Sequence, residues 1–270
     1  MIFRQIVFYS LLVGVLSGAV LTAAQTWQVV PIIHSAEVFE DAAASVPAIE
    51  HTGQLLSAHD AAHVDSADAW APDNGIERTA YTLLSNVLTA IGFSLAIMVV
   101  MVASSSLNNK SVTRFDWRHG LLWGISGYTV FWLAPALGLP PEIPLAATAD
   151  LEARQIWWLF AVVSTAAGLA GLAFGKSPWR WAAPLMLLVP HLVGAPHAPG
   201  AIFADQPPAA AAQLEQLAQQ FIAATAIANI AFWLALGLIS AWAVRRILPP
   251  SGSISPSGSD FPPEIKSSSV

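Results

Sequence analysis

The chain of 270 residues contains no cysteine, so it can form neither a disulfide nor a thiolate metal site. It is also short of charge: 10% of its residues are Asp, Glu, Lys or Arg, against about 25% in a soluble domain. Hydrophobic residues make up 55% of the chain, and the mean hydropathy is +0.59. A water-facing surface cannot be built from this composition. The composition therefore predicts a membrane protein.

The motifs of soluble catalysis are missing as well. The sequence has no G-x-x-x-x-G-K-[ST] phosphate loop, no G-x-S-x-G nucleophile elbow and no H-E-x-x-H zinc motif. It also has no basic patch with interleaved aromatic residues, which a nucleic acid would need. We therefore expect a protein that is not an enzyme, that has no nucleic-acid partner, and that could use ATP only through another subunit.

Long apolar runs predict an all-α, polytopic transmembrane helical bundle. A spanning helix needs about 20 apolar residues, and it satisfies its backbone polar groups internally. A sixth run, at about Trp181–Ala195, is short and broken by Pro184 and Pro190, so its length alone would make it re-entrant or half-spanning. The five strong spans are predicted at about Ile6–Val30, Thr82–Ala103, Leu121–Leu139, Ile156–Phe174 and Phe221–Val244.

The distribution of charge favours six crossings with both termini in the cytoplasm. The expected location is the inner membrane of the cell. In that arrangement the inner segments hold nine Lys and Arg residues and the outer segments hold only Arg78 and Arg154, which matches the positive-inside bias. If the short run did not cross, Arg245 and Arg246 would lie outside, against that bias. The alternative for the first run is a cleaved signal peptide, although the run is longer than the usual 7–15 residues.

These spans define a transmembrane domain over residues 1–248, followed by a tail over 249–270 that is rich in Ser, Pro and Gly and is predicted to be disordered in the cytoplasm. No span holds a buried carboxylate or lysine, so the proton relay of an ion-coupled pump is not visible. The polar side chains in or beside the spans are predicted to form hydrogen bonds between helices. They are Gln25, Asn86, Gln155 and Asn229.

A polar loop over residues 31–80 is predicted to lie outside, between the first two spans. From Pro31 to Arg78 the chain holds nine of its seventeen carboxylates and four of its seven histidines. Carboxylate and neutral imidazole are ligand types that suit borderline divalent metals. The loop therefore indicates a protein that handles a divalent cation at a membrane surface. Its middle part, from Ala42 to Asn74, lacks apolar periodicity and is predicted to be mobile.

Two groups of candidate metal ligands lie in this loop. His34, Glu37 and Glu40 lie at its rim, where i, i+3 pairs would meet if the first helix continued outward; a solvated helix end is the alternative. His59 and His63 are spaced i, i+4 and could share a metal if their segment became helical. The alternative for these two is a flexible polar segment that only raises the local metal concentration.

A third group lies in the run PHLVGAPH, which contains His191 and His197. Its prolines and glycine are expected to break the helix and free backbone carbonyls beside the imidazoles, and irregular backbone at membrane depth is tolerated only inside protein or along a water-lined cavity. The alternative is a proline-rich helix end at the level of the lipid headgroups. Glu142 is the carboxylate expected to complete a metal entrance with these two histidines.

Six short segments, taken in order, resemble the family of predicted cobalt transporter subunits called CbtA, and the resemblance ends near Leu248. It implies about five spans, a bacterial membrane subunit for cobalt uptake linked to cobalamin synthesis, and a small single-span, His-rich partner subunit. The segments are Val30-Pro31 through Glu37 and Glu40; Trp70-Ala71-Pro72 with Gly75–Thr79; Gly120–Gly124; Pro135–Glu142; Arg154–Trp158; and Pro190–Pro196.

The leading hypothesis is membrane transport of a divalent transition-metal cation, with Co²⁺ as the expected cargo and no tightly bound cofactor. The loop would concentrate the metal, and the rim ligands would pass it to the entrance. One alternative is a non-transporting scaffold or metal-sensing subunit whose partner forms the pathway. A membrane enzyme with a metal centre in PHLVGAPH is the other. These ligand types bind nickel, zinc and manganese as well as cobalt, so they do not select the metal.

Overall fold

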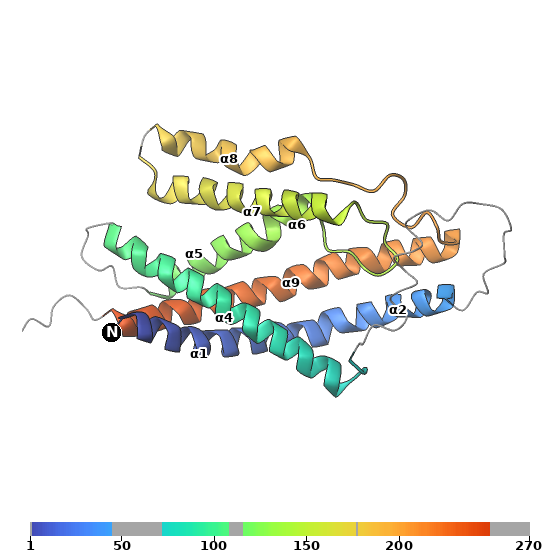
Figure 1. Ribbon diagram of the computed structural model, residues 1–270, viewed down its shortest axis with the longest axis horizontal. Helices are drawn as coiled ribbons and strands as arrows, with labels where there is room; N and C mark the ends of the chain where they lie inside the picture. The colour runs from blue at the N-terminus through green and yellow to red at the C-terminus, as the bar shows by residue number, and fades with distance from the viewer. Residues whose placement is uncertain (1, 45–71, 108–115, 177, 249–270) are drawn as a thin grey trace, which may run out of the picture.

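The computed structural model describes residues 2–44, 72–107, 116–176 and 178–248, and every regular element in these residues is a helix (Figure 1). The predicted tail over 249–270 and the histidines at positions 59 and 63 lie outside the described residues. The elements are α1 (Ile2–Ala24), the π-helical η1 (Gln25–Val29), α2 (Val30–Ala44), α4 (Ile76–Leu107), α5 (Trp117–Tyr128), the π-helical η2 (Thr129–Leu133), α6 (Ala134–Gly138), α7 (Leu151–Phe174), α8 (Trp179–Val193) and α9 (Pro208–Ile247).

Five of these helical stretches are long and apolar enough to cross a membrane, which confirms the predicted all-α, polytopic architecture. They cover Ile2–Ala42, Ile76–Ser105, Trp117–Gly138, Leu151–Phe174 and Pro208–Ile247. Each begins earlier in the chain than its predicted apolar run. The predicted external loop is helical at both ends, over residues 31–44 and 76–80.

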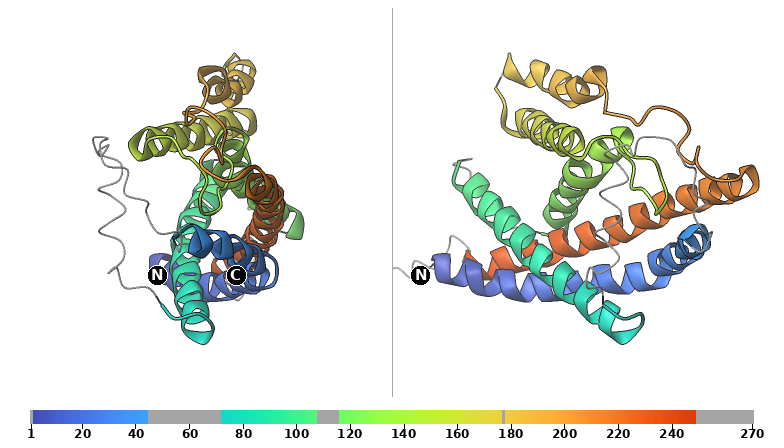
Figure 2. Two further views of the ribbon diagram at one scale, coloured as in Figure 1. Left: turned by 90° about the vertical axis from the view of Figure 1, so that its right-hand side faces the viewer. Right: turned by 45° about the vertical axis from the view of Figure 1, so that its right-hand side comes forward.

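The helices run alternately along one axis of the molecule (Figure 1). The chain moves away from its N-terminus through α1 and α2, returns through α4, and continues to alternate through α5–α6, α7, α8 and α9. The end of α9 therefore lies beside the start of α1, and the Tyr9 and Trp242 rings meet there edge to face at 5.9 Å. In the second figure the pair α7–α8 stands above the group formed by α1, α4 and α9 (Figure 2).

Helix α8 is the short sixth run of the sequence, and its prolines do not interrupt it. The helix is continuous from Trp179 to Val193 and ends at Gly194, whose φ of +85° suits glycine. The predicted break at Pro190 is therefore wrong. Close packing on α7 holds α8 in place: a Cβ on Gly168 would lie 2.7 Å from Leu187, and one on Gly171 would lie 2.9 Å from Ala183. At 1.5 Å per residue, its 15 residues cover about 22 Å.

The two ends of the molecule differ in charge. We call the end where α1 begins and α9 ends the basic end, and the end where α2 stops and α9 begins the acidic end. The described Lys and Arg residues of the basic end are Arg4, Arg118, Lys176, Arg180, Arg245 and Arg246, with Asp116 as its described carboxylate. The described carboxylates of the acidic end are Glu37, Glu40, Asp41, Asp73, Glu77, Glu142, Asp150, Glu152, Asp205 and Glu215, with Arg78 and Arg154 among them.

A hydrophobic core joins α1, α4 and α9. Val13, Met98 and Leu236 are fully buried in it, and Phe131 stacks on Trp233 with ring centroids 5.3 Å apart. One predicted polar contact crosses this core, because the Asn86 amide donates to the side-chain oxygens of Gln25 at 2.6 Å and Thr22 at 3.0 Å. Asn229 differs: it donates to the Thr225 carbonyl of its own helix.

Helices α5 and α9 cross at glycines. A single methyl group added at this crossing is therefore expected to destabilise the fold strongly. A Cβ on Gly237 would lie 2.3 Å from the carbonyl oxygen of Gly120, and this backbone cannot move aside cheaply. We expect Gly237→Ala to lower the free energy of unfolding by about 1–3 kcal/mol, as overpacked cores do. Gly92 is the control, since a Cβ there meets nothing within 4 Å. Thermal unfolding of both variants in detergent, followed by circular dichroism, tests this; equal melting temperatures would contradict it.

Candidate metal site

A second, smaller core builds the acidic end. Ala36 of α2, Ile143, Phe203 and Leu214 of α9 form one buried cluster. The connection before α7 and the connection after α8 are tied together here, because the Ala147 N–H donates to the Ile202 carbonyl at 2.8 Å. The cluster therefore fixes the parts of the chain that carry Glu37, which follows Ala36, and Glu142, which precedes Ile143.

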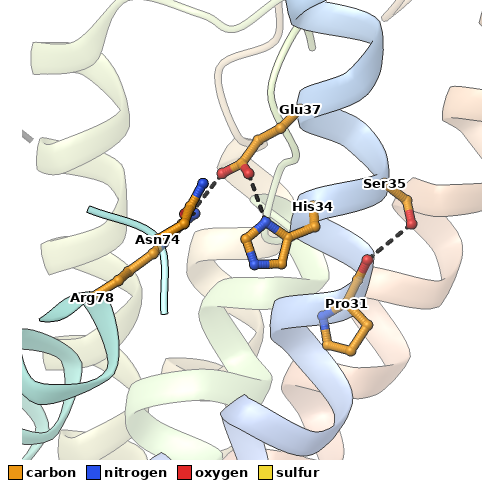
Figure 3. Close-up of polar contacts among 6 residues, drawn as sticks. All are labelled: Pro31, His34, Ser35, Glu37, Asn74 and Arg78. Carbon is orange, nitrogen blue, oxygen red and sulfur yellow. Dashed lines mark hydrogen bonds and ion pairs between the residues drawn. The ribbon is translucent and has the colours of Figure 1, made fainter. Parts of the chain in front are cut away.

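The predicted rim of the loop forms a three-residue contact between α2 and α4 (Figure 3). His34 Nδ1 lies 2.9 Å from Glu37 Oε2, so the i, i+3 contact expected from helical spacing is present. Arg78, on the first turn of α4, approaches the other oxygen: its Nη2 donates to Glu37 Oε1 at 2.7 Å. Its Nη1 donates to Asn74 Oδ1 at 2.9 Å. Glu37 thus accepts from an imidazole on one side and a guanidinium on the other.

Glu37 lies beyond the apolar part of the first helix. Residues 2–42 form a helix of 41 residues, about 60 Å at 1.5 Å per residue, which is twice the thickness of a bilayer core. The guanidinium of Arg78 holds the pKa of Glu37 below its ordinary value, and His34 adds to this effect, while partial burial opposes both. Glu37 is therefore charged at neutral pH and already has a cationic partner.

The third predicted rim ligand does not join this contact. Glu40 is exposed, and it has no hydrogen bond or ion pair to any described residue. The sequence interpretation used Arg78 as a marker of orientation and as part of the segment Gly75–Thr79, and not as a partner of Glu37. Its contact with Glu37, which lies 41 positions earlier in the chain, was missed.

A second carboxylate–arginine pair forms at the same end. Arg154, in the first turn of α7, donates to the carboxylate of Glu142, and both side chains are 27% exposed. Asp150 caps this helix by accepting from the Ala153 N–H at 3.0 Å. Arg154 also borders a cavity of about 380 Å³, and its Nε is buried without a partner among the described residues. Both arginines assigned to the outer segments thus hold a carboxylate that the sequence predicts as a metal ligand.

The two histidines of PHLVGAPH have different surroundings, and one of them contacts the helix that carries Arg154. His191 is half-buried, and its ring meets the edge of Trp157 at 6.1 Å. Trp157 is 5% exposed and fills the space over Gly138, where a Cβ would lie 2.2 Å from its ring. His197 is exposed. The run is thus packed against α6 and α7, with no helix break to free carbonyls at Pro190.

These contacts divide the candidate ligands into two centres instead of one. In the described part of the chain, no group of three or more His, Asp or Glu side chains is close enough to hold a metal ion. The first centre offers His34 and Glu37 as a pair of ligands. The second offers Glu142, while His191 contacts Trp157 on the helix that carries Arg154. Each centre can supply part of a coordination shell, and water or a further residue has to complete it.

The comparison with known families decides the class of the protein. The model of a family described as "Probable cobalt transporter subunit (CbtA)" matches residues 3–245. The chain belongs to the CbtA family. No curated protein and no solved structure matches it. The family match confirms the resemblance seen in the sequence and, with the five apolar helices, shows a multi-pass membrane protein of a transport family.

Five of the six segments that carry the CbtA resemblance meet one another at the acidic end. The segment with Glu37 meets the segment with Arg78 through their ion pair. The segment Pro135–Glu142 meets Arg154–Trp158 through the pair of Glu142 with Arg154 and through the packing of Gly138 on Trp157. Trp157 in turn touches His191. Five of the six segments thus contribute to the two carboxylate–arginine centres or pack beside them, whereas Gly120–Gly124 packs on α9.

Proposed function

We propose that this CbtA chain is the membrane subunit of a bacterial Co²⁺ importer and that metal enters at the acidic end by replacing an arginine on Glu37. The observation that supports this is the contact of His34, Glu37 and Arg78. A carboxylate and an imidazole at helical spacing offer two ligands to a divalent ion, and the guanidinium occupies the place of the cation until the metal arrives.

The strength of the pair suits such an exchange. Glu37 and Arg78 are 28% and 32% exposed, and exposed ion pairs contribute about 0.2–1 kcal/mol. Displacing Arg78 therefore costs little, whereas a divalent ion brings twice the charge to the same carboxylate. Glu142 with Arg154 repeats the arrangement. We propose that Glu142, together with His191 and His197, forms the next binding site for the metal. Glu40 and the residues around His59 and His63 would raise the local metal concentration before either step.

The complex and its setting are part of the same proposal. The family description as a subunit supports a partner, which we propose to be a small single-span, His-rich membrane protein. We place the importer in the inner membrane of the cell and link it to cobalamin synthesis. The test is initial ⁵⁷Co uptake by cells that lack other cobalt importers and carry the chain with its partner. Uptake equal to that of cells without the chain would overturn the proposal.

A scaffold or metal-sensing subunit is the second candidate. The observation that favours it is the lack of a group of three metal-ligating side chains in the described part of the chain. Purified chain in liposomes separates the two candidates, because a transporting subunit carries Co²⁺ across the bilayer with or without stimulation by its partner. A scaffold gives no flux alone and restores flux only when the partner is reconstituted with it.

We propose six crossings with the basic end in the cytoplasm, and a labelling prediction follows. The cysteine-free chain is a clean background for single cysteines. Lys176 precedes α8 and Asp205 follows it, and both are exposed. If α8 returns the chain across the membrane, an impermeant maleimide on intact spheroplasts will label Asp205→Cys but not Lys176→Cys. Lysed membranes will label both. Labelling of both positions from the same side would show five crossings instead.

A further inference from the structure

Three arginines gather at the basic end, where α1 begins and α9 ends. Tyr9 and Trp242 set the register of these antiparallel helices, with ring centroids 5.9 Å apart. Arg4 lies five residues before Tyr9, and Arg245 and Arg246 lie three and four residues after Trp242. At a rise of 1.5 Å per residue, the Cα atoms of the three arginines lie about 5–8 Å beyond the aromatic pair along the helix axes. The two chain ends they belong to lie side by side in Figure 1.

These arginines have no anionic partner among the described residues. All three are exposed, and the ion pairs found among the described residues involve other side chains. Asp116, the described carboxylate at this end, is held by His119, whose Nδ1 lies 2.7 Å from its Oδ1. Three positive charges on two adjacent helix ends therefore face water and headgroups with no protein counter-ion from the described residues.

An exposed aromatic surface lies directly below the arginines. The ring centroids of Phe8 and Tyr9 are 6.0 Å apart, and Tyr9 in turn meets Trp242, so the three rings form one row across α1 and α9. Phe8 is 66% exposed and Trp242 is 42% exposed. The guanidinium of Arg246 lies 5.5 Å from the centre of the Trp242 ring. Charge at the outer level and apolar rings one level deeper match a ligand with an anionic head and an acyl chain.

We propose that this surface binds the headgroup of an anionic phospholipid, with the phosphate shared between Arg4 of α1 and the two arginines of α9. Guanidinium groups bind phosphate oxygens with two parallel hydrogen bonds, so one phosphate can join the two helices. The acyl chains lie along Phe8 and Trp242. A soluble anion or a nucleic acid would use the charge but leave the row of rings uncovered. The bound lipid holds the first and last spans together.

Native mass spectrometry of the full chain tests this inference without any metal, so its outcome is separate from that of the transport proposal. The purified protein in a neutral detergent is titrated with phosphatidylglycerol and, in parallel, with phosphatidylcholine. We expect preferential binding of phosphatidylglycerol. Arg245→Gln and Arg246→Gln are each expected to weaken it about fivefold, the equivalent of ~1 kcal/mol for one arginine near a lipid surface.

Arg118→Gln is the matched control, because Arg118 lies at the same end and stands 5.5 Å from the ring of Trp117, but it belongs to α5. It is expected to leave phosphatidylglycerol binding unchanged. If Arg118→Gln weakened phosphatidylglycerol binding as much as the α9 variants do, the binding would reflect general charge attraction, and the proposed site would be wrong. Equal binding of the two lipids would overturn it too. Displacement of phosphatidylglycerol by inorganic phosphate would show a free-anion site instead of a lipid site, which also contradicts the proposal.

Discussion

Replacing Glu37 with Gln is expected to abolish ⁵⁷Co accumulation by cells that carry no other cobalt importer. Gln has the shape of Glu and keeps an oxygen near Arg78, but it removes the negative charge that a divalent cation needs. His34 Nδ1, which lies 2.9 Å from the carboxylate, then loses its partner as well. Loss of a residue that only supports a metal ligand costs about 10–100-fold in affinity or activity, so loss of the ligand itself is expected to cost at least that much.

Glu77→Gln is the matched control for this experiment. Glu77 lies next to Arg78 on α4 and is exposed, and its carboxylate accepts from the Asp73 N–H at 3.3 Å instead of facing His34. Its loss changes the charge of the acidic end by the same amount as Glu37→Gln does. We expect normal uptake from this variant, measured as the initial rate and divided by the amount of protein in the membrane. Normal uptake by Glu37→Gln at normal membrane levels would remove Glu37 from the metal pathway.

Much of the fold was predictable from the sequence because the membrane imposes a simple rule. An apolar run of sufficient length has to become a helix, and the five strong runs did so. The rule says less about local detail. The π-helical segments η1 and η2 have no simple signature in the sequence, and the prolines of α8 were read as breaks. Helix α8 is instead continuous and packs closely on Gly168 and Gly171 of α7, and this contact joins segments that cannot be paired from spacing alone.

The contacts of the candidate site were likewise predictable only in part. The contact of His34 with Glu37 follows from helical period, because three residues bring side chains to one face. The contacts of Arg78 with Glu37 and of Arg154 with Glu142 depend on how helices and connections pack. The sequence marked both arginines as the two external cations, yet only the fold shows that each one neutralises a carboxylate. Under the proposed function, a metal that binds either carboxylate would first have to displace its arginine.

Replacing Arg78 with Gln is expected to act in the opposite direction to Glu37→Gln and to tighten Co²⁺ binding about fivefold, because it removes a competitor worth up to ~1 kcal/mol. Isothermal titration of the purified chain and the KM of ⁵⁷Co uptake both measure this change. The pH dependence should change as well. Arg78 lowers the pKa of Glu37, so its removal lets that pKa rise. Protons then compete with the metal at a higher pH, and uptake declines earlier on acidification.

Arg78→Lys separates competition from a structural role, since it keeps the positive charge but cannot bridge Glu37 and Asn74 with two nitrogens in one plane as the guanidinium does. If Arg78 is a stand-in for the metal, the Lys variant will keep a metal affinity near that of the natural chain and the Gln variant will exceed both. If Arg78 instead holds α2 against α4, both variants will lose uptake, and the Gln variant will lose more. Loss of uptake by Arg78→Gln with unchanged Co²⁺ affinity would therefore reject the exchange of arginine for metal, while leaving Glu37 as a ligand.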